Sequence, residues 1–237
     1  MIVKDDKPLL PAYRKQAGYS ISQTRSYLDS GFLNTYDDVY GAPRFDSNDN
    51  QRLPGDYYII DFNGDGIVDV NDSAPYGYSS MPQNTYNATV GFEWKGFSCF
   101  VQFYGVTNVT REVTMTNFAN SLNTVYDQGT WWSKETPDAD MPPSRFALSQ
   151  AAYVNGTRYL YDGSFIRLKN AEIAYTFTQP WVHKAGLDHL RLFVSGNNLW
   201  LWARMPDDRE SNLGGFSGGG GAYPTVRRIN FGLRLGL

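Results

Sequence analysis

Apolar and polar residues alternate with a period of two in several stretches of this chain. The clearest stretch is 86–94, whose two faces are Tyr86, Ala88, Val90, Phe92 and Trp94 against Asn87, Thr89, Gly91 and Glu93. Such alternation is typical of a β-strand with one apolar and one polar face. Lys95-Gly96 then predicts a tight hairpin turn, and a return strand begins at Phe97.

Three further stretches, 168–177, 190–197 and 229–237, alternate in the same way. The sequence therefore predicts an all-β fold with about five antiparallel strands. The connection between the third and fourth strands is expected to hold a helical turn at 181–184. The polar faces carry a few charged residues beside small ones, namely Glu93, Glu172 and Arg234.

Two architectures fit this alternation. A soluble β-sandwich would bury the apolar faces in a core, whereas a membrane barrel would turn them toward lipid. The connections favour the barrel, because short links (95–96 and 178–188) alternate with long ones (about 108–163 and 203–223), as periplasmic turns alternate with extracellular loops. Tryptophans near the strand ends also suit the aromatic girdles of a barrel: Trp94, Trp181, Trp200 and Trp202.

The predicted organisation has two parts. Residues 1–84 form an extracellular loop region, and residues 85–237 hold C-terminal barrel strands with long extracellular loops at about 108–163 and 203–223. Five strands cannot close a barrel, and lipid does not tolerate an open sheet edge. The remaining strands are therefore expected elsewhere in the same protein.

Composition narrows the function. The chain has 237 residues, of which 16% are aromatic, and its mean hydropathy is −0.45; no run approaches the roughly 20 apolar residues of a membrane helix. A net charge of −3 without a basic run argues against a nucleic-acid partner. We predict that the chain is not an enzyme, because its sequence shows no framed catalytic set: the carboxylates Asp207, Asp208 and Glu210 lie beside a glycine-rich tract without a rigid frame.

One segment has the spacing of a cation-binding loop. Calcium prefers six to eight oxygen ligands, and a glycine at the sixth position of a twelve-residue loop provides the sharp turn; here that glycine is Gly66. Five side chains and one carbonyl fall at the ligand positions: Asp61, Asn63, Asp65, Ile67 (through its carbonyl), Asp69 and Asp72. The sequence predicts a structural calcium site at 61–72, with a metal-free Asx turn as the alternative.

Several motifs in combination resemble SusC/RagA-type TonB-dependent outer-membrane transporters. They are Pro54-Gly55-Asp56, the 61–72 loop, the 86–94 strand with Lys95-Gly96-Phe97, the segments 132–137 and 140–142, and the segments 162–170 and 190–199. The resemblance covers nearly the whole chain.

The resemblance implies the C-terminal part of a 22-stranded transmembrane β-barrel in the bacterial outer membrane. It also implies TonB-driven import of glycans or peptides, together with a SusD-like surface lipoprotein. The rest of the barrel, an N-terminal plug and the TonB-contacting segment would belong to the same transporter, outside these residues. The alternative function is a soluble calcium-dependent carbohydrate-binding β-domain.

Overall fold

The computed structural model describes residues 2–5, 9–46, 49–112, 130–140, 142–143, 156–205 and 225–237. These residues form two compact units. Unit 1 comprises the described residues up to 81 and those between 110 and 161, and unit 2 comprises those from 82 to 109 and from 162 onward. The predicted boundary at 84/85 remains a prediction, and most of the predicted loop at 203–223 lies outside the described residues.

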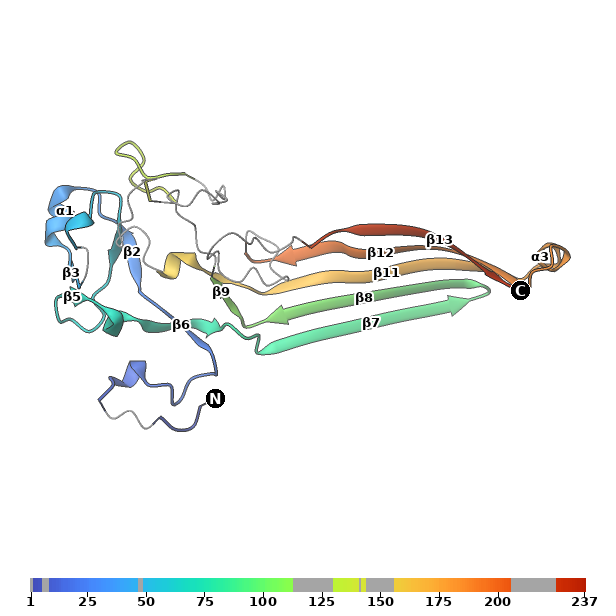
Figure 1. Cartoon of the computed structure of the whole chain (residues 1–237), viewed down its shortest axis with the longest axis horizontal. Coiled ribbons are helices and arrows are strands. Elements are labelled where there is room, and N and C mark those ends of the chain that lie inside the picture. Colours follow the sequence, from blue (N-terminus) through green and yellow to red (C-terminus); the bar gives the residue numbers. More distant parts are fainter. Residues whose placement is uncertain are drawn as a thin grey trace. The chain divides into compact units, whose positions relative to one another are not determined.

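Unit 2 is a single five-stranded sheet, in agreement with the predicted number of strands. Its strands are β7 (Asn84–Trp94), β8 (Phe97–Thr107), β11 (Phe165–Phe177), β12 (His189–Ala203) and β13 (Arg228–Gly236). Their order in the sheet is β13-β12-β11-β8-β7, and every neighbouring pair is antiparallel. The sheet is thus a simple meander, visible as five neighbouring ribbons in Figure 1.

The short connections of the meander lie at one end of the sheet. Lys95 and Gly96, both with positive φ, form the β7–β8 turn, and a carbonyl of Thr176 lies 2.6 Å from where a Cβ on Gly96 would be. The predicted helical turn is confirmed as α3 (Pro180–Lys184), which joins β11 to β12. Figure 1 shows the C-terminus at this same end.

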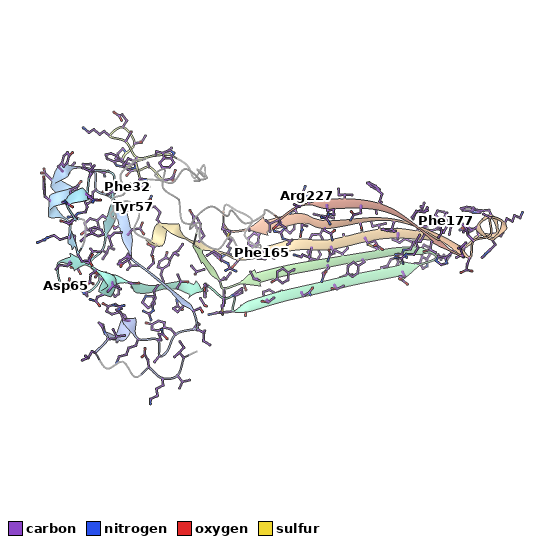
Figure 2. The ribbon with its side chains drawn as sticks, viewed as in Figure 1. Phe32, Tyr57, Asp65, Phe165, Phe177 and Arg227 are labelled. Carbon is purple, nitrogen blue, oxygen red and sulfur yellow. The ribbon has the colours of Figure 1, made fainter. Side chains whose placement is uncertain are left out.

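Two strands are longer than their alternation predicts. β11 begins at Phe165 and β12 continues to Ala203. The register between them shifts between Leu168 and Asn170, and Asn198 has a φ of 53°. This β-bulge interrupts the period-two pattern, because an extra residue reverses which face the following side chains occupy. Figure 2 marks the two ends of β11 at Phe165 and Phe177.

Unit 1 is built from short paired strands. β1 (Gln23–Ser26) pairs with β6 (Ala74–Ser79), and β2 (Asp29–Phe32) pairs with β4 (Tyr57–Ile59), both antiparallel. β3 (Arg44–Phe45) runs parallel to β5 (Ile67–Val68), and β9 (Thr110–Glu112) lies beside β10 (Leu160–Asp162). The helical elements are α1 (Tyr36–Gly41), η1 (Ala12–Arg14), η2 (Asp49–Gln51), η3 (Val70–Asp72) and η4 (Thr157–Tyr159).

A small core and one arginine hold unit 1 together. Phe45, Tyr57, Ile59 and Val68 form a buried cluster, and the Phe32 ring stacks on Tyr57 at 5.0 Å (Figure 2). The guanidinium of Arg158 lies over both rings and 3.4 Å from a carboxylate oxygen of Asp29. Arg158 therefore ties the 156–161 segment to β2 and β4. Among the described residues, no helix has the length and apolar character needed to cross a membrane.

Candidate functional site

One face of the unit 2 sheet is apolar across all five strands. The register places on it the large side chains Tyr86, Val90, Phe92, Trp94, Phe97, Phe103, Ile166, Ile173, Leu192, Val194, Trp200, Trp202, Ile229, Phe231, Leu233 and Leu235. We call this set the apolar face. Their exposed fractions run from 36% for Phe97 to 81% for Phe231, so within the described residues this face has no protein cover.

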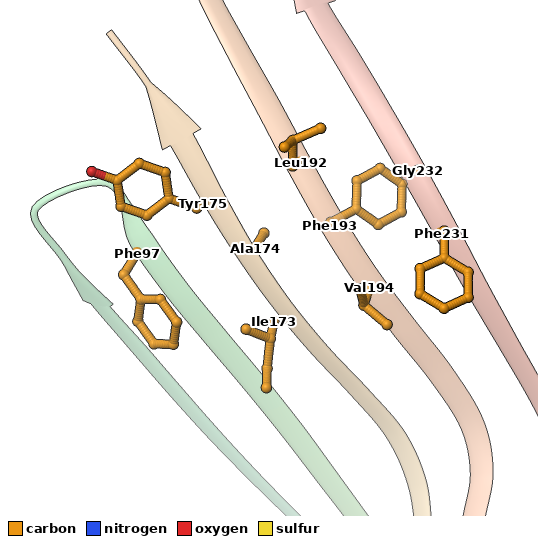
Figure 3. Close-up of a pocket in the computed structure, with 9 residues that line it drawn as sticks. All are labelled: Phe97, Ile173, Ala174, Tyr175, Leu192, Phe193, Val194, Phe231 and Gly232. Carbon is orange, nitrogen blue, oxygen red and sulfur yellow. The ribbon is translucent and has the colours of Figure 1, made fainter. Parts of the chain in front are cut away.

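A shallow hollow of about 410 Å³ on the sheet is formed by four of the strands (Figure 3). Its lining consists of Phe97, Ile173, Ala174, Tyr175, Leu192, Phe193, Val194, Phe231 and Gly232. None of these residues is charged. An uncovered apolar surface of this extent is uncommon on soluble monomers and marks a membrane or protein contact.

Aromatic side chains frame the apolar face at both ends. Trp94 ends β7, and the ring of Trp181 in α3 meets Phe177 at 5.7 Å, at the end with the short turns. Trp200 and Trp202 lie at the far end of β12. All four indoles are at least 44% exposed. Amphipathic rings in this arrangement suit the two interfaces of a bilayer.

The opposite face of the sheet, called here the polar face, is the more polar of the two and carries a row of side-chain amides near its middle. Toward the end with the long connections, Val106 and Phe165 on the same face pack together with Tyr104. Asn197 donates to Asn170 at 2.5 Å, Asn170 donates to Gln102 at 2.6 Å, and Gln102 donates to Asn87 at 3.2 Å. These residues lie on β12, β11, β8 and β7 in turn. We call them the amide row. The three hydrogen bonds all run from β12 toward β7, so they form one continuous chain across four strands.

Sequence reasoning did not single out the amide row. The four residues are polar positions in alternating strands, but which amides are neighbours depends on the register between strands, and hydrogen-bonded members of the row lie up to 68 residues apart in the chain. The signal that could have found them is the recurrence of Asn or Gln near the middle of each polar face.

An ion pair of the polar face lies nearer the short turns. Arg191 donates to Glu172 at 2.8 Å, and both side chains are partly exposed. Glu93 and Ser98 line hollows beside this pair. The ion pair neutralises two charges, whereas Arg228 lies opposite Asn197, Arg167 lies opposite Tyr104, and the Lys169 ammonium lies over the Tyr104 ring. Positive charge therefore lies beside the amide row.

The predicted calcium loop lies in unit 1, between β4 and β6. Asp61 accepts the backbone N–H groups of Gly66 at 2.6 Å and Gly64 at 2.7 Å. The hydrogen bond from Gly66 is the main cause that lowers the pKa of the Asp61 carboxyl below its ordinary value of 3.8. Gly64 and Gly66 have φ values of 75° and 86°, which favour glycine. The chain therefore curls around the Asp61 side chain. Figure 2 labels Asp65 of the same loop.

The other predicted ligands also bind backbone groups. Asp72 is fully buried and accepts N–H groups from Phe62 and Asp69 at 2.8 and 2.7 Å. Asp69 caps η3 through the N–H of Asn71. Asn63 and Asp65 are exposed and hydrogen-bonded to each other at 2.9 Å, and Ile67 begins β5.

The loop brings the six predicted residues together in one turn without gathering their carboxylates around a point. In the described part of the chain, no group of three or more His, Cys, Asp or Glu side chains is placed to hold a metal ion. The calcium site remains a prediction. The carboxylates Asp207, Asp208 and Glu210 lie outside the described residues.

Two curated proteins of Formosa agariphila are similar in sequence to this chain. TonB-dependent receptor P3 is 26% identical over 194 residues, which are 77% of this chain and 19% of the receptor. TonB-dependent receptor P26 is 27% identical over 217 residues, which are 86% of this chain and 22% of the receptor. The chain thus spans about a fifth of the length of these relatives. No protein-family model matches it.

Solved structures of a peptide importer have the same fold. The RagAB peptide transporter aligns with a TM-score of 0.60 and 16% identity over 90% of this chain and 22% of that chain. The open-open state of the RagAB peptide importer aligns with a TM-score of 0.57 over 91% of this chain. The sequence relatives and the structural neighbours named here are receptors and transporters rather than enzymes.

The predicted resemblance and fold class are therefore confirmed. This chain is an all-β segment that is similar in sequence to TonB-dependent receptors and has the fold of part of a SusC/RagA-type transporter.

Proposed function

We propose that these residues form part of the barrel wall of a TonB-dependent transporter in the bacterial outer membrane. The observation that carries the proposal is the uncovered apolar face on a sheet whose opposite face is polar. The strands contain 9 to 15 residues, and a tilted strand needs about 9–11 residues to cross a bilayer. The apolar face would contact lipid, and the polar face would border the aqueous interior.

Strand direction supports a larger barrel. β7 and β13 form the two edges of the sheet and run in the same direction, because four antiparallel steps separate them. A closed antiparallel barrel needs an even number of strands, so an odd number of further strands would have to join these two edges. A second copy inserted in the same direction across the membrane cannot close it, because its edge strands would lie parallel to β7 and β13.

The alternative, a soluble carbohydrate-binding β-domain, predicts a different solubility. Membrane fractionation of cells that carry the protein should find it in the outer membrane, and extraction should require detergent. A monodisperse protein in plain buffer would instead favour the soluble domain, because the apolar face would then have to be covered by protein.

We propose that the whole transporter imports a glycan or a peptide, with energy supplied through TonB and with a SusD-like surface lipoprotein as partner. The supporting observations are the receptor names of the curated relatives and the peptide importers among the structural neighbours. Affinity purification of the membrane protein should recover a lipoprotein, and deletion of tonB should abolish uptake of the cargo. Uptake that continues without TonB would contradict this mechanism.

We also propose that the 61–72 loop binds calcium as a structural ion. Its carboxylate, amide and carbonyl oxygens are the hard ligands that calcium prefers. Asn63 and Asp65 are exposed and bonded to each other, so they could turn toward an ion without disturbing the core, while the buried Asp72 keeps the turn closed.

Thermal unfolding in calcium and in EDTA tests this site. Calcium should raise the midpoint of the folded protein, and Asp65→Ala should remove that rise. The matched control is Asp37→Ala, because Asp37 is an exposed carboxylate of unit 1 outside the loop. Equal midpoints in calcium and EDTA, with no heat on titration, would favour the metal-free Asx turn.

A further inference from the structure

The shallow hollow on the apolar face, called here the apolar hollow, lies toward the end of the sheet with the short turns. Phe97 is the first residue of β8, Tyr175 lies two residues before the end of β11, and Leu192 is the fourth residue of β12. Because the short turns of outer-membrane barrels are periplasmic, this end would lie in the periplasmic leaflet, which consists of glycerophospholipids. We propose that the apolar hollow binds a glycerophospholipid, with an acyl chain in the hollow and the phosphate beside Lys95, Tyr175 and Lys184.

The apolar hollow suits an acyl chain. The register places Ile173, Val194 and Phe231 side by side on three neighbouring strands, and Figure 3 shows them below Tyr175 and Leu192. An acyl chain in this hollow would gain van der Waals contacts. Lipid tails are as apolar as these side chains, so the hollow by itself does not distinguish one lipid from another. Selection among lipids must come from the headgroup.

One donor and one cation lie together at the edge of the apolar hollow nearest the turns. The Tyr175 ring directs its hydroxyl toward the β7–β8 turn (Figure 3), and a Cβ on Gly96 of that turn would lie 3.6 Å from the ring carbon that carries the hydroxyl. Lys95, the other residue of the turn, is exposed, and its ammonium lies 4.9 Å from the centroid of the Trp94 ring. The hydroxyl and the ammonium can both donate to the oxygens of a phosphate.

The helix α3 provides a second cation on the other side of Tyr175. Ring contacts lead from Tyr175 to Phe177 at 4.6 Å and from Phe177 to Trp181 at 5.7 Å. Lys184 follows Trp181 by three residues, so the two side chains lie on the same side of this helical turn, and Lys184 is exposed. Tyr175 therefore lies between the strand turn that carries Lys95 and the helix that carries Lys184.

Acidic side chains described near the turns do not cancel this charge. Glu93 lies on the polar face, on the other side of the sheet. The Asp188 carboxylate lies 3.2 Å from a ring nitrogen of His189. The edge of the apolar hollow is therefore positively charged, which complements the phosphate of a phospholipid. A lipid with the same acyl chains and no phosphate lacks this attraction.

The proposal rests on the proposed function, because the apolar face must contact lipid in an assembled transporter. The test uses that transporter with all its strands, delipidated in detergent and then incubated with dipalmitoylphosphatidylglycerol, dipalmitoylglycerol or lipid A. Native mass spectrometry at increasing lipid concentration measures the affinity for each. The wild-type protein should bind the phosphatidylglycerol more tightly than either of the other lipids.

Two substitutions separate the apolar hollow from the headgroup contacts. Val194→Trp fills the hollow with an apolar side chain and should remove phosphatidylglycerol binding. Lys95→Asn removes the ammonium, and asparagine tolerates the positive φ of 46° at this position. It should weaken phosphatidylglycerol binding about fivefold and leave dipalmitoylglycerol binding unchanged.

Val90→Trp and Lys134→Asn are the matched controls, because Val90 lies on the apolar face outside the hollow and Lys134 belongs to unit 1. Both should bind as the wild type does. Equal wild-type affinity for the phosphatidylglycerol and dipalmitoylglycerol, tighter binding of lipid A, or unchanged binding by Val194→Trp would overturn the site.

Heat-modifiable migration of every variant reports barrel assembly separately. If Val194→Trp does not assemble, Lys95→Asn decides the proposal, and equal phosphatidylglycerol affinity in this variant and the wild type would overturn it. Loss of heat-modifiable migration in the wild type would count against the proposed function instead.

Discussion

Gly232 shows how one missing side chain shapes the polar face of the sheet. A Cβ at this position would lie 2.0 Å from the ring of Phe193 on the neighbouring strand. Gly232→Ala should therefore force Phe193 out of its place and destabilise the sheet by about 1–3 kcal/mol, as overpacking does. The temperature at which the folded band disappears in a heat-modifiability gel measures the effect.

Gly91→Ala is the matched substitution, because Gly91 lies on the polar face of the other edge strand. The nearest atom to its added Cβ is a carbonyl oxygen 4.0 Å away. The Gly91 variant should melt at the wild-type temperature. Equal melting temperatures of the two variants would contradict the contact with Phe193, because the effect of Gly→Ala on the unfolded chain is stabilising and cannot produce the predicted loss.

Asp61 makes the acidic loop sensitive to pH. Its folded pKa is lowered, first by the hydrogen bond from Gly66, so the folded state favours the charged carboxylate. The stabilisation is present above the ordinary value of 3.8 and is lost as pH falls from there through the folded pKa. Hydrogen-exchange protection of the Gly64 and Gly66 amides should accordingly fall only in that acid range. Asp61→Asn should remove this pH dependence.

At the scale of the element, β7 offers a test of which face meets lipid. Val90 lies on the apolar face and is 64% exposed, and its neighbour Thr89 points to the polar face. Val90→Lys should cost about 2–4 kcal/mol near the bilayer midplane and reduce the amount of folded protein in the outer membrane. Thr89→Lys should be tolerated, because its side chain would reach water.

The result for Val90→Lys also distinguishes the membrane barrel from the soluble β-domain. In a soluble domain with an uncovered apolar face, Val90→Lys would improve solubility without loss of folded protein. Such a gain would contradict the lipid-facing assignment.

Strand bounds were predictable where alternation was unbroken. The β7–β8 hairpin follows from the pattern around Lys95-Gly96. The part of β12 that follows Asn198 was not predictable. The bulge near Asn198 interrupts the alternation, and the position of a bulge depends on the partner strand. Likewise, the amide row required the register, which pairs Gln102 with Asn170 and Asn170 with Asn197.

At the scale of the whole molecule, the open edges of the sheet limit what this chain can do alone. The N–H and C=O groups along the outer sides of β7 and β13 have no partner strand among the described residues. Lipid cannot satisfy these groups. We therefore expect residues 1–237 expressed alone to fail to form a heat-modifiable barrel in detergent or liposomes. Co-expression with the remaining strands should restore the folded band, and a folded band without them would contradict this expectation.

The sequence by itself determined the number of strands in the unit 2 sheet, the two chemically distinct faces and the resemblance to SusC/RagA-type transporters, because period-two alternation and turn residues are local properties of the chain. It also located the acidic loop, whose predicted ligand residues lie within twelve residues. It did not determine the short paired strands of unit 1. The tertiary structure decided which side chains meet across strands. It revealed the amide row, the contact of Phe193 with Gly232 and the burial of Asp72. These features depend on register and packing between distant segments, which no local pattern encodes.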